Sequence, residues 1–523
     1  MEAVSTRGLA FTRSEPAVCA LVAAASAAIV AWVGPPGGDA AAHLYRTELV
    51  REGVLVWDNL WFAGHYPLAS YSVLYYLFAA LVGNELLVVA GAIVSAALFA
   101  ALARDEWGEA ARWPARAYAV LAATPLFTGT YSYALGIAAA LGALRLLQLG
   151  RRRAAVAAAA LALGFAPLAF AFLCLALAAA AIDRRRLDRP VAAALSVVAA
   201  LELAVLFVFP SSGRYPFSPL SLAAALTVSA LGAALAFRRA PALAWFFALW
   251  AAVALVAFAV PSPFGDNLTR LRMLVFPLVL VAAAVARFRP RALAAAALAF
   301  ALAYNLGPDL SALPKRLGDV RTAEAEFWQP ALDVVGNDPN HRVEVVPTFG
   351  HWEAYRVPRA GIPLARGWYR QIDLVENPEL YGEPLRPEAY RRWLDRLGVR
   401  FVLLPNARLG PMGASREADL LRSGRAGLEE VFRGIDWTVY AVPDPTPILA
   451  GGRLTRLTHS ELAGGVEAAG AHLLRVRWSP YWEAAGDVCV EPGPDGLTIL
   501  KARRAGSFSL RAAFPGNAHC PGR

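Results

Sequence analysis

The stretch PAVCALVAAASAAIVAWV (residues 16–33) decides the fold class, and GPPGGDAAAHLYRTELVREGVLVWDNLWFAGHYP (residues 34–67) follows it directly. The first stretch is apolar and about as long as the hydrocarbon core of a bilayer requires of a helix. The second stretch is polar and aromatic, and it begins where that crossing ends. The chain therefore starts with a membrane helix and a long loop at the membrane surface.

The composition extends this reading to most of the chain. Of the 523 residues, 58% are hydrophobic and 17% are charged, and the mean hydropathy is +0.45. Soluble proteins are about half apolar and a quarter charged. The net charge of +10 does not indicate nucleic-acid binding, because the arginines lie mostly in short loops between apolar runs, as the positive-inside rule expects.

Apolar runs predict a polytopic α-helical membrane domain over residues 1–305 with about eleven transmembrane helices. The candidate spans cover residues 16–33, 67–83, 85–103, 115–129, 131–149, 154–182, 191–209, 219–237, 241–260, 271–287 and 291–305. The run 154–182 is either one long helix or two short ones divided at GFAPLA. The first span lacks a cleavage pattern and is expected to stay as an anchor.

Basic loops predict the orientation of these spans. The expected cytoplasmic segments are the start with Arg7 and Arg13, DRRRLDR (183–189), FRR (237–239) and RFRPR (287–291). The first loop (34–66) and everything after Asn305 then face outward. Simple alternation would place GRRR (150–153) outward too, so the topology between residues 67 and 182 stays open.

Residues 306–523 predict a soluble extracytoplasmic domain of mixed α/β and β-sandwich structure. Helix RPEAYRRWLDRLG (386–398) leads into strand VRFVLLP (399–405), and short strands with turns fill the last hundred residues. Cys489 and Cys520 lie in this domain, where a disulfide is permitted, and free thiols are the alternative. The sequence contains no CxxC, HExxH, Walker A, GxSxG or GxGxxG motif.

The first loop carries the main catalytic candidate, Asp39. From this residue the sequence predicts a helix that the aspartate caps, with Asp39, His43 and Arg46 on one face at i, i+4 and i+7. That face offers a carboxylate, an imidazole and a guanidinium to a common ligand. The alternative is that Asp39 is only a helix cap and Arg46 only a headgroup anchor.

Aromatic and polar side chains follow in the same loop. They are Trp57, Asp58, Trp61, His65 and Tyr66. Aromatic rings with interleaved polar groups are typical of sugar-binding surfaces, whereas an interfacial aromatic belt is the alternative.

These residues carry a resemblance to known families. A long first outward loop that opens with an acid resembles the GT-C superfamily of membrane glycosyltransferases. Residues 37–83, PSPFGDNLTRLRMLVFPL (261–278) and YRRWLDRLGVRFVLLP (390–405) are similar to bacterial membrane proteins labelled 6-pyruvoyl-tetrahydropterin synthase-related. Pterin chemistry is not implied, because the seven scattered histidines do not reproduce the zinc-binding set of pterin synthases.

The GT-C resemblance implies an inverting glycosyltransferase in a bacterial inner membrane. It would move a sugar from a polyprenyl-phosphate donor to an extracytoplasmic glycan, lipid or protein, with Asp39 as the base that deprotonates the acceptor hydroxyl. Some relatives hold a divalent cation between paired acids at this place. Gly38 and Ala40 flank Asp39, so no acidic pair is present and metal dependence is left open.

Two outward loops offer cations for the donor phosphate, because arginine donates paired hydrogen bonds to phosphate. The candidates are Arg270 and Arg272, with Asp266 and Asn267 nearby, and Arg214. The alternative is that these arginines only snorkel to lipid headgroups. We expect Asp39 to line an outward-opening pocket together with Arg270 or Arg272.

Two other classes of function remain as alternatives. A flippase or transporter would be expected to bury polar residues at mid-membrane, but the spans are nearly free of charge except for Glu202. A non-catalytic, membrane-anchored glycan-binding or assembly protein would place the function in residues 306–523. The aromatics of that domain with most interest are Trp368, Tyr369, Trp478, Tyr481 and Trp482, for which a buried core position is the alternative.

Overall fold

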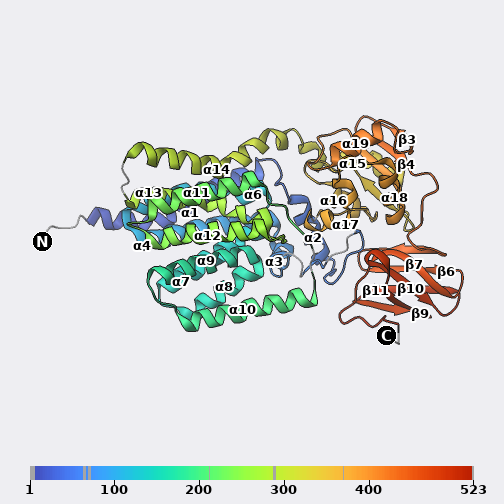
Figure 1. Cartoon of the computed structure of the whole chain (residues 1–523), viewed down its shortest axis with the longest axis horizontal. Coiled ribbons are helices and arrows are strands. Elements are labelled where there is room, and N and C mark those ends of the chain that lie inside the picture. The colour runs from blue at the N-terminus through green and yellow to red at the C-terminus, as the bar shows by residue number, and fades with distance from the viewer. Residues whose placement is uncertain are drawn as a thin grey trace. The chain divides into compact units, whose positions relative to one another are not determined.

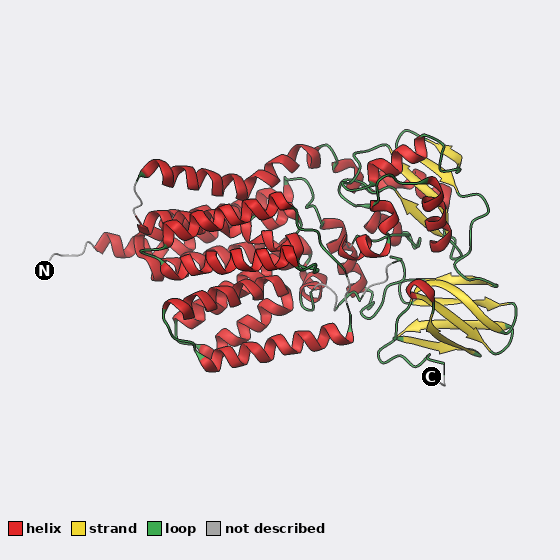
Figure 2. Ribbon diagram, viewed as in Figure 1, coloured by secondary structure: helices red, strands yellow, loops and turns green. Residues whose placement is uncertain are grey.

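The computed structural model describes residues 6–62, 66–68, 72–210, 213–286, 290–368 and 370–520 (Figures 1 and 2). The chain forms two compact units. The helical unit comprises Met1–Gly37, Tyr71–Pro210 and Arg214–Pro314, and the mixed unit comprises Gly38–Ser70, Ser211–Gly213 and Lys315–Arg523. Most of the first loop thus belongs with the C-terminal residues, and not with the 1–305 domain in which the sequence analysis placed it.

Long apolar helices build the helical unit. They are α1 (Thr6–Trp32), α3 (Tyr75–Val82), α4 (Asn84–Trp107), α5 (Arg112–Leu121), α6 (Thr124–Thr128), α7 (Tyr131–Gln148), α8 (Arg152–Phe165), α9 (Pro167–Asp183), α10 (Arg189–Val208), α11 (Pro219–Ala236), α12 (Pro241–Ala259), α13 (Arg272–Ala286) and α14 (Arg291–Leu317), with 3-10 turns η1 (Gly108–Ala111) and η2 (Gly265–Leu271). Proline stands at the first or second position of α9 to α12, where its fixed φ suits a helix start.

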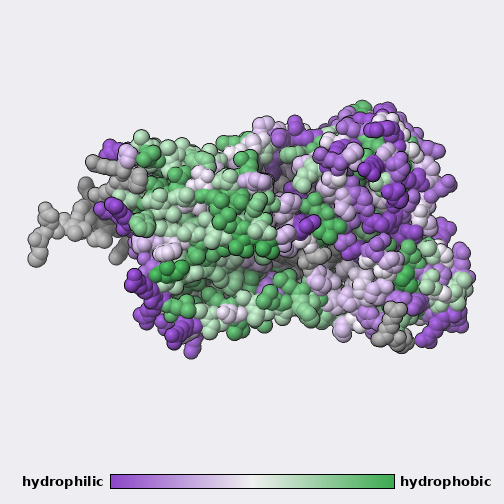
Figure 3. Space-filling view, in the orientation of Figure 1, coloured by the Kyte–Doolittle hydropathy of each residue, from purple (hydrophilic) through white to green (hydrophobic). Residues whose placement is uncertain are grey.

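Seven helical segments of the described chain are long and apolar enough to cross a membrane. These segments are Ser14–Trp32, Asn84–Thr128, Arg189–Val208, Pro219–Ala236, Pro241–Ala259, Gly265–Ala286 and Arg291–Leu317. Hydrophobic side chains cover most of the helical unit in the space-filling view, as expected of a surface that faces lipid (Figure 3). The chain is a multi-pass membrane protein by these criteria.

Three predicted spans differ from the observed helices. The span over 67–83 is wrong, because α3 holds 8 residues, about 12 Å of helix, whereas the hydrocarbon core is about 30 Å thick. The run 154–182 is two helices, which divide at the extended residue Ala166. The last helix does not end at residue 305 but continues to Leu317, with Pro308 and Pro314 inside it.

Ion pairs connect helix ends near the basic turns at one end of the helical unit. Arg145 at the end of α7 binds Asp105 near the end of α4, at 2.5 Å. Arg152 at the start of α8 binds Asp188 before α10, at 2.7 Å. The GRRR turn therefore lies at the same end as the DRRRLDR turn, because α8 and α9 form a hairpin between them.

The mixed unit contains an α/β layer and a pair of antiparallel sheets. Its helices are α2 (Ala40–Arg51), α15 (Ala325–Val335), α16 (Glu353–Arg359), α17 (Arg370–Glu376), α18 (Pro387–Leu397) and α19 (Ala414–Arg422), with 3-10 turns η3 (Val320–Ala323), η4 (Pro378–Tyr381) and η5 (Pro494–Gly496). Its strands are β1 (Arg342–Val345), β2 (Val399–Pro405), β3 (Glu429–Arg433), β4 (Trp437–Ala441), β5 (Gly452–Leu457), β6 (Glu461–Val466), β7 (Gly470–Arg477), β8 (Trp482–Ala485), β9 (Val488–Pro492), β10 (Leu497–Ala502) and β11 (Gly506–Ala512).

The first sheet has the order β1-β2-β4-β3, with β1 parallel to β2 and the other pairs antiparallel. The other two sheets, β7-β10-β9 and β5-β6-β11-β8, are antiparallel throughout. A disulfide joins Cys489 on β9 to Cys520. The sequence had left open whether these two cysteines form a disulfide or stay as free thiols. The predicted combination of α/β and sandwich-like β structure is therefore present.

The first loop enters the core of the mixed unit. Phe62 belongs to the same buried cluster as Trp393 and Val402. Trp61 forms a β-bridge with Leu364, and its indole N–H donates to the carbonyl of Ala354 at 2.9 Å. This packing is the physical reason why the loop does not belong to the helical unit.

Candidate active site

Asp39 stands at the start of α2, but its side chain does not cap that helix. The residue occupies the N-cap position with φ −105° and ψ 16°, and its carboxylate accepts no capping hydrogen bond. Instead, the indole N–H of Trp368 donates to Asp39 Oδ1 at 3.1 Å. The helix therefore begins at the predicted residue, but the predicted capping by the aspartate side chain is wrong, and the carboxylate is held by a side chain from a distant part of the mixed unit.

Two further side chains lie on the Trp368 ring. The His351 imidazole stacks on it with ring centroids 3.4 Å apart and planes at 12°. The Arg370 guanidinium lies 5.0 Å from the ring centroid, a distance at which a cation is attracted to the π face. His351 is itself fixed by Glu353, whose carboxylate lies 3.0 Å from Nδ1.

Arg316 places a second positive charge beside the start of α2. A methyl group built on Gly38 would lie only 2.3 Å from a terminal nitrogen of the Arg316 guanidinium. Glycine at position 38 is therefore what lets this guanidinium pack against the backbone next to Asp39. The half-buried Asp39 carboxylate thus has an indole donor and a neighbouring cation within the mixed unit.

A small cavity lies behind Trp368. Its volume is about 30 Å³, which is room for roughly one water molecule. The lining includes His351, Glu353, Trp368, Arg370, Glu344, Arg366, Asp373 and Tyr381. This cavity is too small for a sugar ring.

A buried ion cluster forms one side of that cavity. Arg366 lies 2.5 Å from Glu344 and 3.1 Å from Glu417, and all three are buried. Burial raises the pKa of Glu344 well above its usual range, and the negative charge of Glu417 raises it further. The Arg366 charge opposes this rise, so one guanidinium faces more than one carboxyl group in this cluster.

The predicted aromatic surface of the first loop is not open to a ligand. Trp57, Trp61 and Tyr66 are 4%, 1% and 6% exposed. Trp57 donates its N–H to Asn59 Oδ1 at 3.0 Å, and Tyr66 packs edge-on against Trp57 and Tyr481. The expectation that these rings stack on sugar is wrong, because they form part of the core of the mixed unit.

The predicted polar residues of the loop are also buried. His43 and Arg46 are each 2% exposed, so they do not form an open face with Asp39. Asp58 is fully buried and accepts the Tyr45 hydroxyl at 2.9 Å, with His459 Nδ1 also at 2.9 Å. His65 lies outside the described residues.

The helical unit holds the predicted phosphate-binding residues. Arg272 forms a two-pronged salt bridge with Asp309, at 2.9 and 2.8 Å. Its role as a phosphate ligand is therefore not supported. The continuation of α14 past residue 305 brings in Asp309, whose carboxylate already accepts hydrogen bonds from both terminal nitrogens of the Arg272 guanidinium. Asp266 and Asn267 lie in η2. Arg214 is exposed and Arg270 is half-buried.

Sequence reasoning named Trp368 but did not connect it with Asp39, and it missed His351, Arg316 and His459. No short motif marks these residues, because each one approaches the first loop from a distant part of the chain. Of the other aromatics of interest, Trp478 is half-buried, Tyr481 and Trp482 are 9% and 1% exposed, and Tyr369 lies outside the described residues. Across the described ranges, no group of three or more His, Cys, Asp or Glu residues is placed to hold a metal ion.

Comparisons with known proteins identify no family for the chain. No family model matches the chain, so the resemblance to the pterin synthase-related family has no support there, and no curated protein matches it. The crystal structure of ArnT from Cupriavidus metallidurans in the apo state aligns with 83% of this chain and 98% of that chain, at 14% identity and a TM-score of 0.40. At that TM-score the alignment does not establish a shared fold or function.

Proposed function

We propose that the chain is a multi-pass membrane glycosyltransferase that takes a sugar from a polyprenyl-phosphate donor. The observation that supports this proposal is the state of Asp39. Its carboxylate does not cap a helix but is held by the Trp368 indole, with Arg316 beside the preceding residue. A carboxylate that is positioned and half-buried is suited to proton transfer.

In the proposed reaction, Asp39 accepts the proton of an acceptor hydroxyl as that oxygen attacks the anomeric carbon. A bond forms between the hydroxyl oxygen and this carbon, and the bond from the carbon to the phosphate oxygen breaks with inversion. The electron pair of the broken bond leaves with the polyprenyl phosphate. Trp368 is a positioning residue, because its N–H binds one carboxylate oxygen and leaves the other to the acceptor.

The leaving phosphate requires positive charge, and Arg270 and Arg214 are the proposed ligands. Arg272 is not included, because Asp309 neutralises it. We also propose that the basic turns of the helical unit face the cytoplasm of a bacterial cell. The acceptor would then be an extracytoplasmic glycan, lipid or protein.

A non-catalytic glycan-binding or assembly protein is the second candidate. The burial of Trp57, Trp61 and Tyr66 favours it, because it gives the first loop a structural role in the mixed unit. The water-sized cavity beside Trp368 is consistent with the same reading.

Proteoliposomes that contain the purified full-length protein and a polyprenyl-phosphate sugar labelled in the sugar separate these functions. A glycosyltransferase releases polyprenyl phosphate and moves the label to an acceptor from membrane extracts. An Arg270→Gln variant should weaken donor use, whereas Arg238→Gln, in the basic turn before α12, is the matched control. Binding of the donor without release of polyprenyl phosphate, or its translocation without cleavage, would contradict the proposal.

A further inference from the structure

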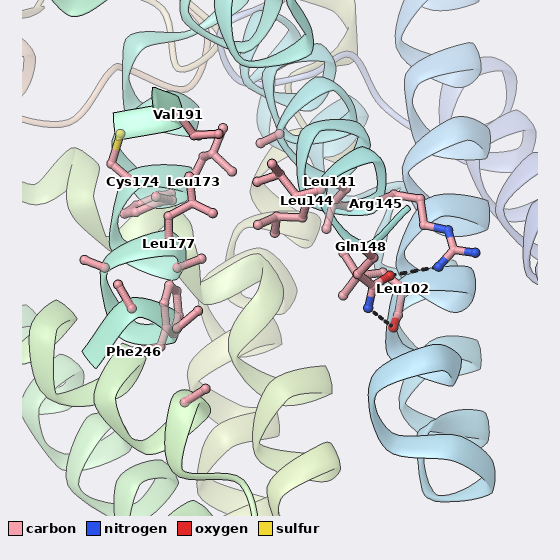
Figure 4. Close-up of a pocket in the computed structure, with 18 of the residues that line it drawn as sticks. Leu102, Leu141, Leu144, Arg145, Gln148, Leu173, Cys174, Leu177, Val191 and Phe246 are labelled. Carbon is pink, nitrogen blue, oxygen red and sulfur yellow. Dashed lines mark hydrogen bonds between the residues drawn. The ribbon is translucent and has the colours of Figure 1, made fainter. Parts of the chain in front are cut away.

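The helical unit contains a large cavity that the proposed function does not use. Its volume is about 1210 Å³, which exceeds the roughly 300–1,000 Å³ typical of small-molecule pockets. Helices α4, α7, α9, α10, α12 and α13 line it. Figure 4 shows Leu173 and Leu177 on one side of the opening and Leu141 and Leu144 on the other.

The cavity runs along most of α9. Its lining extends from Ala169 near the start of that helix to Arg184 just after its end. At a rise of about 1.5 Å per residue this is about 22 Å, longer than the roughly 15 Å of one leaflet of the hydrocarbon core. The apolar lining of α9 ends at Ala181, about 18 Å from Ala169, so the apolar part of the cavity is still long enough for an acyl chain.

The lining changes from apolar to charged along this length. Leucine, valine and phenylalanine side chains line the interior, among them Leu173 and Phe246 (Figure 4). Arg145, Arg152, Arg184 and Arg186 line the cavity at the ends of helices that the basic turns connect. Apolar walls offer water few hydrogen-bond partners. In a membrane, lipid chains are the molecules available to fill it.

The arginines at the basic end differ in how far they are neutralised. Asp105 binds Arg145, and Asp188 binds Arg152, so these two are occupied. Arg184 is paired more weakly, because its guanidinium lies 3.8 Å from the Glu106 carboxylate. Within the part of the chain that the structure describes, no acidic side chain pairs with the exposed Arg186. The mouth of the cavity therefore presents positive charge that its own acids do not cancel.

We propose that this cavity is a binding site for an anionic glycerophospholipid. The phosphate would lie against Arg184 and Arg186, and the acyl chains would fill the space between α7, α9, α10 and α12. Basic pockets between transmembrane helices on the cytoplasmic side commonly bind anionic headgroups. None of the residues proposed for sugar transfer, Asp39, Arg214 or Arg270, lines this cavity.

The proposal is tested by purifying the full-length protein in nanodiscs of phosphatidylcholine, alone or mixed with phosphatidylglycerol. Native mass spectrometry then measures which lipid remains bound after transfer to mild detergent. Phosphatidylglycerol should be retained, and an Arg184→Gln/Arg186→Gln variant should bind it about thirtyfold more weakly, at about fivefold for each arginine. An Arg238→Gln/Arg239→Gln variant removes two charges from the α11–α12 turn, outside the cavity lining, and should retain the lipid.

Cys174 gives a second readout that does not depend on a substitution in the cavity. It is a free, half-buried thiol of α9 that lines the cavity, whereas Cys19 is fully buried. In a Cys19→Ser background, phosphatidylglycerol should slow the reaction of Cys174 with an alkyl maleimide, relative to phosphatidylcholine alone. The Arg184→Gln/Arg186→Gln variant should lose most of this protection.

Three outcomes would overturn the proposal. Equal retention of the two phospholipids would show a cavity that takes any acyl chain. Selective retention of polyprenyl phosphate from native membranes would assign the cavity to a different lipid. Equal weakening by the Arg238→Gln/Arg239→Gln control would show a general effect of charge at that end of the bundle.

Discussion

The buried cluster of Tyr45, Asp58 and His459 should hold the first loop to the mixed unit. Asp58 is fully buried and accepts hydrogen bonds from the Tyr45 hydroxyl at 2.9 Å and from the Leu60 amide at 3.2 Å. Asp58 Oδ1, the oxygen that accepts the Leu60 amide, also lies 2.9 Å from His459 Nδ1. The His459 side chain is 19% exposed, so solvent screens this pair only weakly.

An Asp58→Ala substitution would leave buried donors without their acceptor. Each buried donor that loses its partner costs about 1–3 kcal/mol, and breaking a buried ion pair by removing one member costs about 3–5 kcal/mol. We therefore expect a loss of about 3–5 kcal/mol. If α2 and the following loop open as one segment, their amide hydrogens should exchange at least about a hundredfold faster.

Hydrogen exchange of the full-length protein in detergent, followed over residues 40–62, measures this effect. Asp487→Ala is the matched control in the same unit, because Asp487 pairs with Arg504 on the surface, where the side chains are 41% and 80% exposed. Such an exposed pair contributes less than about 1 kcal/mol. If the two variants exchange equally over residues 40–62, the Asp58 cluster does not fix the loop.

Two further predictions concern pH and packing in the same unit. Burial lowers the pKa of His459, but the hydrogen bond and charge of Asp58 outweigh burial and raise it above its usual value. The stabilisation by His459 is therefore complete below about pH 6.5 and is lost as the pH rises through the raised pKa. Protection of the α2 amides from hydrogen exchange should fall over that rise in pH in the wild type but not in His459→Gln. Gly38→Ala should displace the Arg316 guanidinium, which is the far end of a flexible side chain, so the variant should melt at or slightly below the wild-type temperature. Gly307→Ala meets nothing within 4 Å inside α14 and should melt higher, because alanine is favoured over glycine in a helix by about 0.5–1 kcal/mol; equal melting temperatures for the two variants would contradict the proposed contact.

Local sequence signals predicted the elements that depend on local physics. The stretch 399–405 is strand β2 with those bounds, and the helix before it ends where Gly398 adopts φ +72°. Apolar runs also located most membrane helices, because burial in lipid requires long uninterrupted hydrophobic segments. The predicted span over residues 67–83 was wrong, because an aromatic apolar run has the same composition whether it crosses the membrane or ends a surface loop.

The candidate site was less predictable, because it depends on long-range contacts. Asp39 and Trp368 are 329 positions apart, and Tyr45 and His459 are 414 apart. A loop rich in tryptophan is compatible with an interfacial belt, a sugar site or a buried core, and composition does not distinguish these three. The Asp309 salt bridge to Arg272 was missed because α14 continues past residue 305.

The most direct test of the proposed catalytic role is the single-turnover rate of sugar release in Asp39→Asn, with donor binding measured in the same sample. A general base typically contributes about 10²–10⁴ to the rate. We therefore expect the rate to fall by about that factor while the donor still binds, and Asp333→Asn, an exposed site on α15, to match the wild type. Full sugar release by Asp39→Asn would contradict a role for this carboxylate in the chemistry.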